Sequence, residues 1–351
     1  MINILISIIF IQLVIFVHEL GHYLIAKKVG ADVYEFSVGI GPKIFQFKKN
    51  ETLYTLRAIP LLGHVLFQEI EEDETTESIT EIPLSENNLK NKGYLSELSV
   101  YLAGPVFNFI TAFIVLCGIY IYSGFPTMTI DSVLDKSPAQ EAGITKGDTL
   151  LAIDNIDIYN WSDVSSTINK LKKDSINLTI QRKDNSIENI SVNTVYDKNT
   201  NNYSIGISPQ FKQDLFKSIN YGFKNTIKTI QSNAVAISEL FLGWIPGFGN
   251  DSYNVELTGP IGTIQTVSKQ SKESLDSLLL MFASFNINVG VINLIPLIPV
   301  LDGGQAFIRT IEAIRKKSFK ENTIVNLKLG GALFLIGLMI LTTFKDIVNL
   351  F

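Results

Sequence analysis

The sequence predicts a polytopic α-helical membrane protein that carries an inserted domain of mixed α and β structure. The 351 residues are 46% hydrophobic and only 18% charged, whereas soluble proteins carry about 25% charged residues. Four separate stretches are long and apolar enough to cross hydrocarbon, which takes about 20 residues. Between the second and third stretches, apolar and polar residues alternate in short runs separated by turn residues, a pattern typical of β-strands.

These patterns divide the chain into eight parts. The first apolar stretch is interpreted as a span and not as a signal peptide, because no basic region precedes it and no small-residue cleavage site follows it. In chain order the predicted parts are a first span (1–26), a loop with a β-hairpin (27–98), a second span (99–122), a folded domain (126–209), a helical linker (210–277), a third span (278–304), a short loop (305–326) and a fourth span (327–346). The amphipathic linker is predicted either to lie on the membrane surface or to pack on the folded domain.

Basic residues predict the orientation of these spans. They gather in the loop after the first span and in the loop between the third and fourth spans. Loops rich in Lys and Arg face the cytoplasm, so the folded domain is predicted to lie on the other side of the membrane. The net charge of -5 offers no basic face for nucleic acid, and the single cysteine, Cys117, excludes an intrachain disulfide.

His18-Glu19-Leu20-Gly21-His22 is an HExxH motif at the end of the first apolar run. Residues four apart on a helix project from nearly the same face, so both imidazoles can reach one metal ion. A carboxylic acid at membrane depth costs about 2.5–3.5 kcal/mol on insertion scales, and such residues are usually functional. The motif therefore predicts a metal site, with Glu19 beside the metal.

The third metal ligand is predicted to come from the end of the third span. A tetrahedral catalytic zinc site has three protein ligands and one open position, and HExxH supplies two. Asp302 follows a segment broken by Pro296 and Pro299 and precedes Gly303-Gly304. Irregular backbone at membrane depth occurs where it is buried in protein or lines a cavity, and a carboxylate there needs a partner such as Zn²⁺.

Together, HExxH in an early span and a proline-broken Leu-Asp-Gly in a late one resemble the site-2 protease family of intramembrane metalloproteases. Gly104-Pro105-Val106-Phe107-Asn108, the segment 36–43 and Gly259-Pro260-Ile261-Gly262 are also similar to that family. The resemblance implies one Zn²⁺ held by His18, His22 and Asp302, with Glu19 as the catalytic acid and base.

The same resemblance suggests substrate contacts at Asn293, Gly63, His64 and Asn108. The segment around Gly63 is similar to a membrane-dipping β-hairpin that receives the substrate as an added strand. Two departures from the family stand out: both Leu297 and Ile298 lie between the prolines, where one residue is usual, and His64 stands where the family tends to have Tyr. The extra residue affects the placement of Asn293, whereas His64 is interpreted as a hairpin residue or as a fourth ligand of a latent state.

The folded domain resembles a bacterial PDZ domain. The similarity covers residues 137–144, Lys146-Gly147-Asp148, the run 150–154 and Trp161. PDZ domains bind extended peptides or chain ends by strand addition, although this one could equally act as a steric filter. A single PDZ domain between the second and third spans is typical of the bacterial family members that act on anti-sigma factors and remnant signal peptides. This implies regulated intramembrane proteolysis of single-span membrane proteins.

Two other functions fit parts of the sequence. A membrane scaffold that uses the PDZ domain to hold partners predicts that Glu19 is dispensable. A metal transporter would also carry His, Glu and Asp inside the membrane, but the sequence has no repeated half to give alternating access.

Overall fold

The computed structural model describes residues 2–67, 70–72, 79–81, 86–197, 202–242 and 259–348. The chain divides into two compact units, one formed by Met1–Leu116 with Phe223–Phe351 and the other by Cys117–Gly222. Four helices in the described residues are long and apolar enough to cross a membrane. They are α1 (Ile2–Lys28), α2 (Tyr94–Tyr122), α7 (Leu275–Asn293) and α9 (Glu321–Val348).

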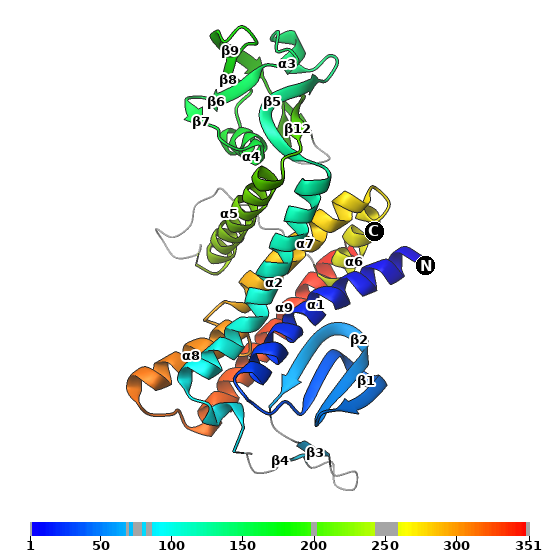
Figure 1. Cartoon of the computed structure of the whole chain (residues 1–351), viewed down its shortest axis with the longest axis vertical. Coiled ribbons are helices and arrows are strands. Elements are labelled where there is room, and N and C mark those ends of the chain that lie inside the picture. The colour runs from blue at the N-terminus through cyan, green and yellow to red at the C-terminus, as the bar shows by residue number, and fades with distance from the viewer. Residues whose placement is uncertain are drawn as a thin grey trace. The chain divides into compact units, whose positions relative to one another are not determined.

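Helix α1 of the first unit packs against α6 (Pro260–Gln270) and α7 (Figure 1). The ring of Phe10 meets the rings of Phe282 and Phe285 edge to face, with centroids 5.4 and 5.5 Å apart. The hydroxyl of Ser7 donates to the carbonyl of Ile264 on α6 at 3.0 Å. These contacts hold the helix that carries HExxH against two helices from the far end of the sequence.

Helices α1 and α2 approach closely at a pair of glycines. A Cβ at Gly21 of α1 would lie 2.5 Å from the carbonyl oxygen of Ala103 on α2, which a real Cβ cannot do. Gly104 of α2 makes the reciprocal approach to α1. Small residues at such crossings let two helix backbones come together in a membrane.

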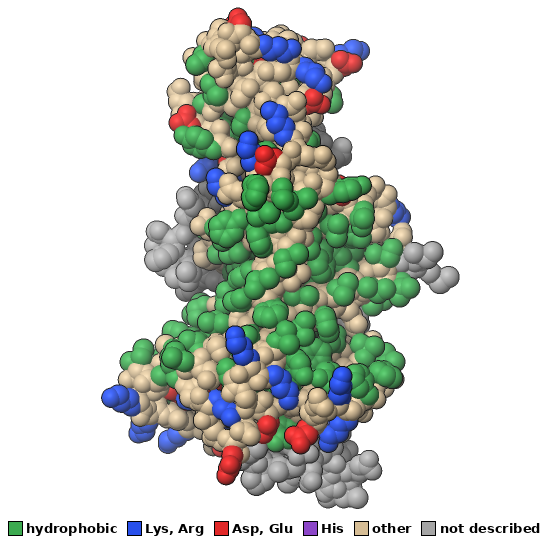
Figure 2. All heavy atoms as spheres, viewed as in Figure 1, with side chains coloured by type: hydrophobic (Ala, Val, Ile, Leu, Met, Phe, Trp, Pro, Cys, Tyr) green, Lys and Arg blue, Asp and Glu red, His purple; other side chains and the backbone are tan. Residues whose placement is uncertain are grey.

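Helix α9 presents apolar side chains to its surroundings, and no residue of its most apolar 18-residue window is buried. Figure 2 shows apolar side chains covering helices of the first unit, with Lys and Arg gathered near one end of them. At its C-terminal end, Asp346 accepts hydrogen bonds from the backbone N–H groups of Gly259 and Gly262. This carboxylate caps the N-terminus of α6 and fixes α9 to it.

Strands β1 (Glu35–Lys49) and β2 (Thr52–Leu66) form an antiparallel hairpin that curls on itself (Figure 1). Residues 35–38 pair both with 53–56 and with 63–66, so the start of β1 lies between two parts of β2. One face packs on α1, where the rings of Phe16 and Tyr23 meet Phe36. This pair of strands therefore lies against the HExxH helix.

The third predicted span ends at a sharp break. Helix α7 stops at Asn293, and α8 (Asp302–Arg315) begins after a turn that contains both prolines. A Cβ on Gly303 would overlap the backbone of Leu294, and one on Gly304 would overlap the backbone of Ile298. The two glycines therefore let the start of α8 lie directly on the turn, which fixes the position of Asp302.

The segment predicted as a helical linker contains two helices, α5 (Leu215–Leu242) and α6. Residues 243–258 of that segment lie outside the described residues. The remaining short elements of the first unit are β3 (Ile70–Glu72), β4 (Ile79–Glu81) and the 3-10 helix η1 (Leu89–Asn91).

The second unit is built on an antiparallel sheet with strand order β12-β5-β6-β8-β9. Its strands are β5 (Phe125–Val133), β6 (Thr149–Ile153), β7 (Ile156–Asp157), β8 (Ser175–Gln181), β9 (Ile187–Asn193), β10 (Val195–Asp197), β11 (Asn202–Ser204) and β12 (Ile207–Lys212). Helices α3 (Pro138–Glu141) and α4 (Trp161–Leu171) complete it. Alternate residues of the strands, among them Leu150, Leu178 and Ile180, are fully buried in one core. This is the α+β architecture that the PDZ-like segment predicts.

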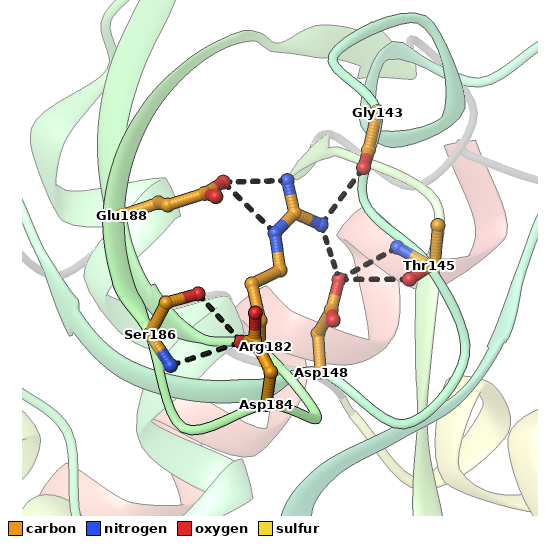
Figure 3. Close-up of polar contacts among 7 residues, drawn as sticks. All are labelled: Gly143, Thr145, Asp148, Arg182, Asp184, Ser186 and Glu188. Atoms are coloured by element: carbon orange, nitrogen blue, oxygen red, sulfur yellow. Dashed lines mark hydrogen bonds and ion pairs between the residues drawn. The ribbon is translucent and has the colours of Figure 1, made fainter.

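A buried carboxylate ties the PDZ-like motif to the sheet (Figure 3). Asp148 is 1% exposed and accepts from the backbone N–H of Thr145 at 2.8 Å and from the guanidinium of Arg182 at 2.7 Å. Arg182 also donates to the carbonyl of Gly143 at 2.9 Å and pairs with the half-exposed Glu188. The Gly-Ile-Thr-Lys-Gly-Asp turn is therefore held to β8 and β9 through one arginine.

We expect Asp148→Ala to loosen this turn, because it leaves the Thr145 N–H and the Arg182 guanidinium without their acceptor. Hydrogen bonds to charged groups are worth about 1.5–3 kcal/mol, so amides of the turn and of β6 should exchange about 10- to 100-fold faster in the intact chain. Hydrogen–deuterium exchange measures this. Glu188→Gln is the matched control, since that partner is exposed and its pair is worth under about 1 kcal/mol; equal exchange in the two variants would contradict the assignment.

Candidate metal centre

Three side chains from opposite ends of the sequence meet at one point. Nε2 of His18 and Nε2 of His22 lie 3.2 Å apart, and Oδ2 of Asp302 lies 2.9 Å from the first and 3.3 Å from the second. Both imidazoles are buried, and the described residues contain no other cluster of three such ligand atoms. The structure thus brings together the three residues that the sequence predicts as ligands.

The spacing and chemistry of these atoms fit zinc. Two ligand atoms about 2.0–2.1 Å from a tetrahedral zinc ion lie about 3.3–3.4 Å apart, close to the separations of the three donor atoms. Two imidazoles and one carboxylate form a usual catalytic zinc set that leaves a fourth position open. Besides the two imidazoles, the buried Oδ2 of Asp302 has no hydrogen-bond partner among the described residues.

Helix α2 contacts the Nδ1 atoms of both histidines. Nδ1 of His22 lies 2.7 Å from the carbonyl oxygen of Val100, and Nδ1 of His18 lies 3.2 Å from the side-chain amide of Asn108. A metal-ligating histidine usually donates its other ring N–H to such a group. Each ring therefore turns its Nε2 toward Asp302.

Gly104, between these two contacts, touches the ligand atoms themselves. A Cβ at this position would overlap Nε2 of His22 and lie 2.8 Å from Nε2 of His18. A hydrogen at Gly104 leaves the space beside the two nitrogens that any larger side chain would fill. The Gly-Pro-x-x-Asn motif is visible in the sequence, but this role of Gly104 was not predicted from it. The spacing of four between Gly104 and Asn108, which places both residues on one helix face, was the signal that could have indicated the role.

Glu19 lies beside the ligand set, buried, and faces an edge of the hairpin. A Cβ at Gly63 of β2 would lie 2.5 Å from Cγ of Glu19, so only glycine lets the strand come this close. Residues 63–66 pair with 35–38 on one side and have no second strand neighbour among the described residues. The predicted substrate contact Gly63 is thus placed directly against the predicted catalytic residue.

His64 belongs to a different cluster. It pairs with Ser37 across the sheet, and its Nε2 lies 3.9 Å from Oε2 of Glu35. Interaction with His64 and the hydrogen bond from Arg57, 3.0 Å long, hold the pKa of the Glu35 carboxyl at about 2. The described ligand cluster does not include His64.

Asn293, predicted to contact substrate, is the last residue of α7. Its amide nitrogen donates to the carbonyl of Val289, one turn earlier, at 3.0 Å. One N–H of the amide is therefore committed to its own helix, and the second N–H and the amide oxygen are the groups left to meet another molecule.

A buried ion pair, which sequence reasoning missed, fixes the helix that carries Asp302. Glu97 of α2 is 2% exposed and accepts a hydrogen bond from Nη2 of Arg309 on α8 at 2.8 Å. Nε of Arg309 lies 2.6 Å from the second carboxylate oxygen, which completes the ion pair. Arg309 also pairs with Glu312, which caps the backbone N–H of Phe319. Because 212 residues separate Glu97 and Arg309, no local pattern in the sequence could have linked them.

Four membrane-type helices with an HExxH–Asp cluster define a membrane-embedded metalloprotease. The model of peptidase family M50 matches residues 6–338, so the chain belongs to this family. It is therefore a zinc metalloprotease of the site-2 protease type, and the scaffold and transporter interpretations are set aside.

Full-length relatives carry the same description. A protein of Clostridium acetobutylicum is 30% identical over 99% of this chain and 97% of its own length. One of Clostridium perfringens is 32% identical over 95% of each, and one of Staphylococcus aureus is 31% identical over 100% of this chain and 99% of its own length. Each is named "Putative zinc metalloprotease". Among solved structures, the PDZ domain of an SdrC-like protein of Listeria monocytogenes matches 25% of this chain and 88% of its own, at 22% identity and a TM-score of 0.20.

We expect Gly104→Ala to abolish zinc binding, because the added methyl group overlaps the ligand nitrogens. Bound zinc in the purified protein, measured by mass spectrometry, should fall from about one ion per chain to near zero. Gly118→Ala is the matched control on the same helix, since a Cβ there meets nothing within 4 Å. A Gly104→Ala protein that keeps its zinc would show that the α1–α2 contact is not required by the metal.

Proposed function

We propose that this protein is an intramembrane zinc endopeptidase that cleaves single-span membrane proteins. His18, His22 and Asp302 hold one Zn²⁺, and Glu19 is the catalytic acid and base. The observation that carries the proposal is the burial of Glu19 and the convergent ligand atoms on α1, a helix with the length and composition of a membrane span. A buried carboxylic acid and two imidazoles in such a helix are retained for function, because they are costly there.

The chain's own groups divide the work of peptide hydrolysis. Zinc, when bound, supplies Lewis acidity that polarises the scissile carbonyl and lowers the pKa of water. Glu19 takes the proton of the attacking water and later returns it to the leaving amine. The carbonyl of Val100 and the backbone of Gly104 keep the imidazole of His22 in place while this happens.

The free edge of the hairpin is the proposed binding site for the substrate chain. Residues 63–66 can hydrogen-bond an extended peptide as an added strand, and Gly63 brings that strand against Glu19. The peptide carbonyl would then lie between Glu19 and the ligand atoms. The amide oxygen of Asn293 is a further proposed contact with the substrate backbone, and His64 supports the strand through Glu35.

The proposed location is the cytoplasmic membrane of a bacterium, with the PDZ-like domain outside and the metal centre near the cytoplasmic side. The basic loops support this orientation. In the second unit, β12 and β9 are the terminal strands of the sheet, so an extended peptide or chain end can add to an edge there. Single-span anti-sigma factors and remnant signal peptides are the proposed substrates.

Glu19→Gln tests the proposal directly. It removes the base but none of the ligands, so the purified variant should keep its zinc and lose cleavage of a single-span substrate by about 10²–10⁴-fold. His18→Ala should lose both, and a chelator should reduce the wild type to the level of Glu19→Gln.

Glu141→Gln, an exposed carboxylate on α3, serves as the matched control and should cut normally. A Glu19→Gln protein that cleaves at the wild-type rate would rule out the proposed mechanism. A wild type that binds no zinc would rule out the metal centre.

We also expect substrates with a helix-breaking residue near the cut to be cleaved faster. An intact α-helix commits its carbonyls to i→i−4 hydrogen bonds, whereas the proposed added strand needs them free. A span with a central Gly-Pro pair should be cut at least ~10-fold faster than a poly-Leu span of equal length, in initial rates measured in detergent. Equal rates would show that the enzyme does not need to unwind its substrate.

A further inference from the structure

We infer that Asn108 is a positioning residue for the metal centre, the outer partner that fixes the ring of His18, and not a contact for substrate. This inference rests on the proposed function. Sequence resemblance had placed Asn108 among the substrate contacts. Instead, its side chain is 0% exposed and its amide lies 3.2 Å from Nδ1 of His18.

The two histidines need the same support and receive it from different groups. When Nε2 of an imidazole binds a metal ion, the ring proton must sit on Nδ1, which then requires an acceptor. For His22 the acceptor is the carbonyl oxygen of Val100, 2.7 Å away. For His18 the group at Nδ1 is the side-chain amide of Asn108, which is placed with its Nδ2 3.2 Å from the ring nitrogen. Rotation of that amide presents Oδ1 instead, and Oδ1 is the acceptor that completes the pair.

The buried amide of Asn108 also needs this partner. Its Oδ1 has no hydrogen-bond partner among the described residues, and an unsatisfied buried oxygen costs about 1–3 kcal/mol. Rotation of the side-chain amide by about 180° exchanges its nitrogen and oxygen. Oδ1 can then accept a hydrogen bond from the Nδ1–H of His18. Metal on Nε2 of His18 therefore goes with the amide orientation that gives Oδ1 of Asn108 a donor.

Helix α2 supplies the whole outer support at intervals of one turn. Val100, Gly104 and Asn108 are four residues apart, so they share one helix face. Val100 holds His22, Gly104 leaves room for the Nε2 atoms of both histidines, and Asn108 holds His18. Of the two acceptors, only that of His18 is a side chain, which makes Asn108 the position where this support can be changed by mutation.

The test compares Asn108→Leu with Asn108→Asp in the full-length protein in detergent. The leucine variant keeps the branched shape of the side chain and removes the acceptor, so zinc should bind roughly 10- to 100-fold more weakly, the usual effect of losing such a partner. The aspartate variant restores an acceptor and should bind zinc within about threefold of the wild type. Competition with a chromogenic chelator measures both constants, and the absorption spectrum of the cobalt-substituted protein should change in the leucine variant and be recovered in the aspartate variant.

Asn286→Leu is the matched control, because Asn286 is equally buried in α7 and its amide nitrogen donates to the carbonyl of Phe282. It should leave the zinc constant and the cobalt spectrum unchanged. If Asn108→Leu loses cleavage through a raised KM while its zinc constant and cobalt spectrum stay as in the wild type, Asn108 is a substrate contact and the inference is wrong. An equal loss of zinc in Asn286→Leu would also overturn it, whereas a wild type without zinc would instead overturn the proposed function.

Discussion

The close contact between α1 and α2 is the constraint on which the metal centre depends. An apolar helix that carries two histidines and a glutamate must give their polar atoms partners, because hydrocarbon offers none. Gly21 and Gly104 bring the two backbones together, and only then can Nδ1 of His22 reach the carbonyl of Val100 at 2.7 Å. The same approach turns both Nε2 atoms toward the space that Asp302 closes.

Asp302 depends on a second set of constraints at the start of α8. Two glycines seat the helix on the turn after α7, and the pair between Arg309 and Glu97 ties it to α2. Helix α2 therefore contacts both halves of the ligand set, the histidines through one face and the aspartate through this ion pair. The Glu97 carboxylate is buried and would be left without its partner if this pair broke, so the pair holds α8 to α2.

Local spacing made much of this predictable. The interval of four in HExxH places His18 and His22 on one helix face, and the prolines predict the break before Asp302. The PDZ-like domain and the four spans follow from alternation and hydropathy. Contacts between distant segments cannot be predicted from local spacing, because they depend on how the helices and strands cross. Examples are the double pairing of residues 35–38, the approach of Gly63 to Glu19 and the contact of Asn108 with His18. A single sequence carries no direct record of those crossings.

The extra residue between the prolines shows how the turn separates its two ends. Ile298 is 5% exposed and its carbonyl lies against Gly304, whereas Leu297 is 63% exposed. Leu297 therefore lies on the outside of the turn, whereas Ile298 contacts the start of α8. Asn293 lies on the other side of Leu297, at the end of α7, and its amide nitrogen bonds to Val289. An insertion at this point thus changes the reach of the proposed substrate contact and leaves the metal ligand where the two histidines require it.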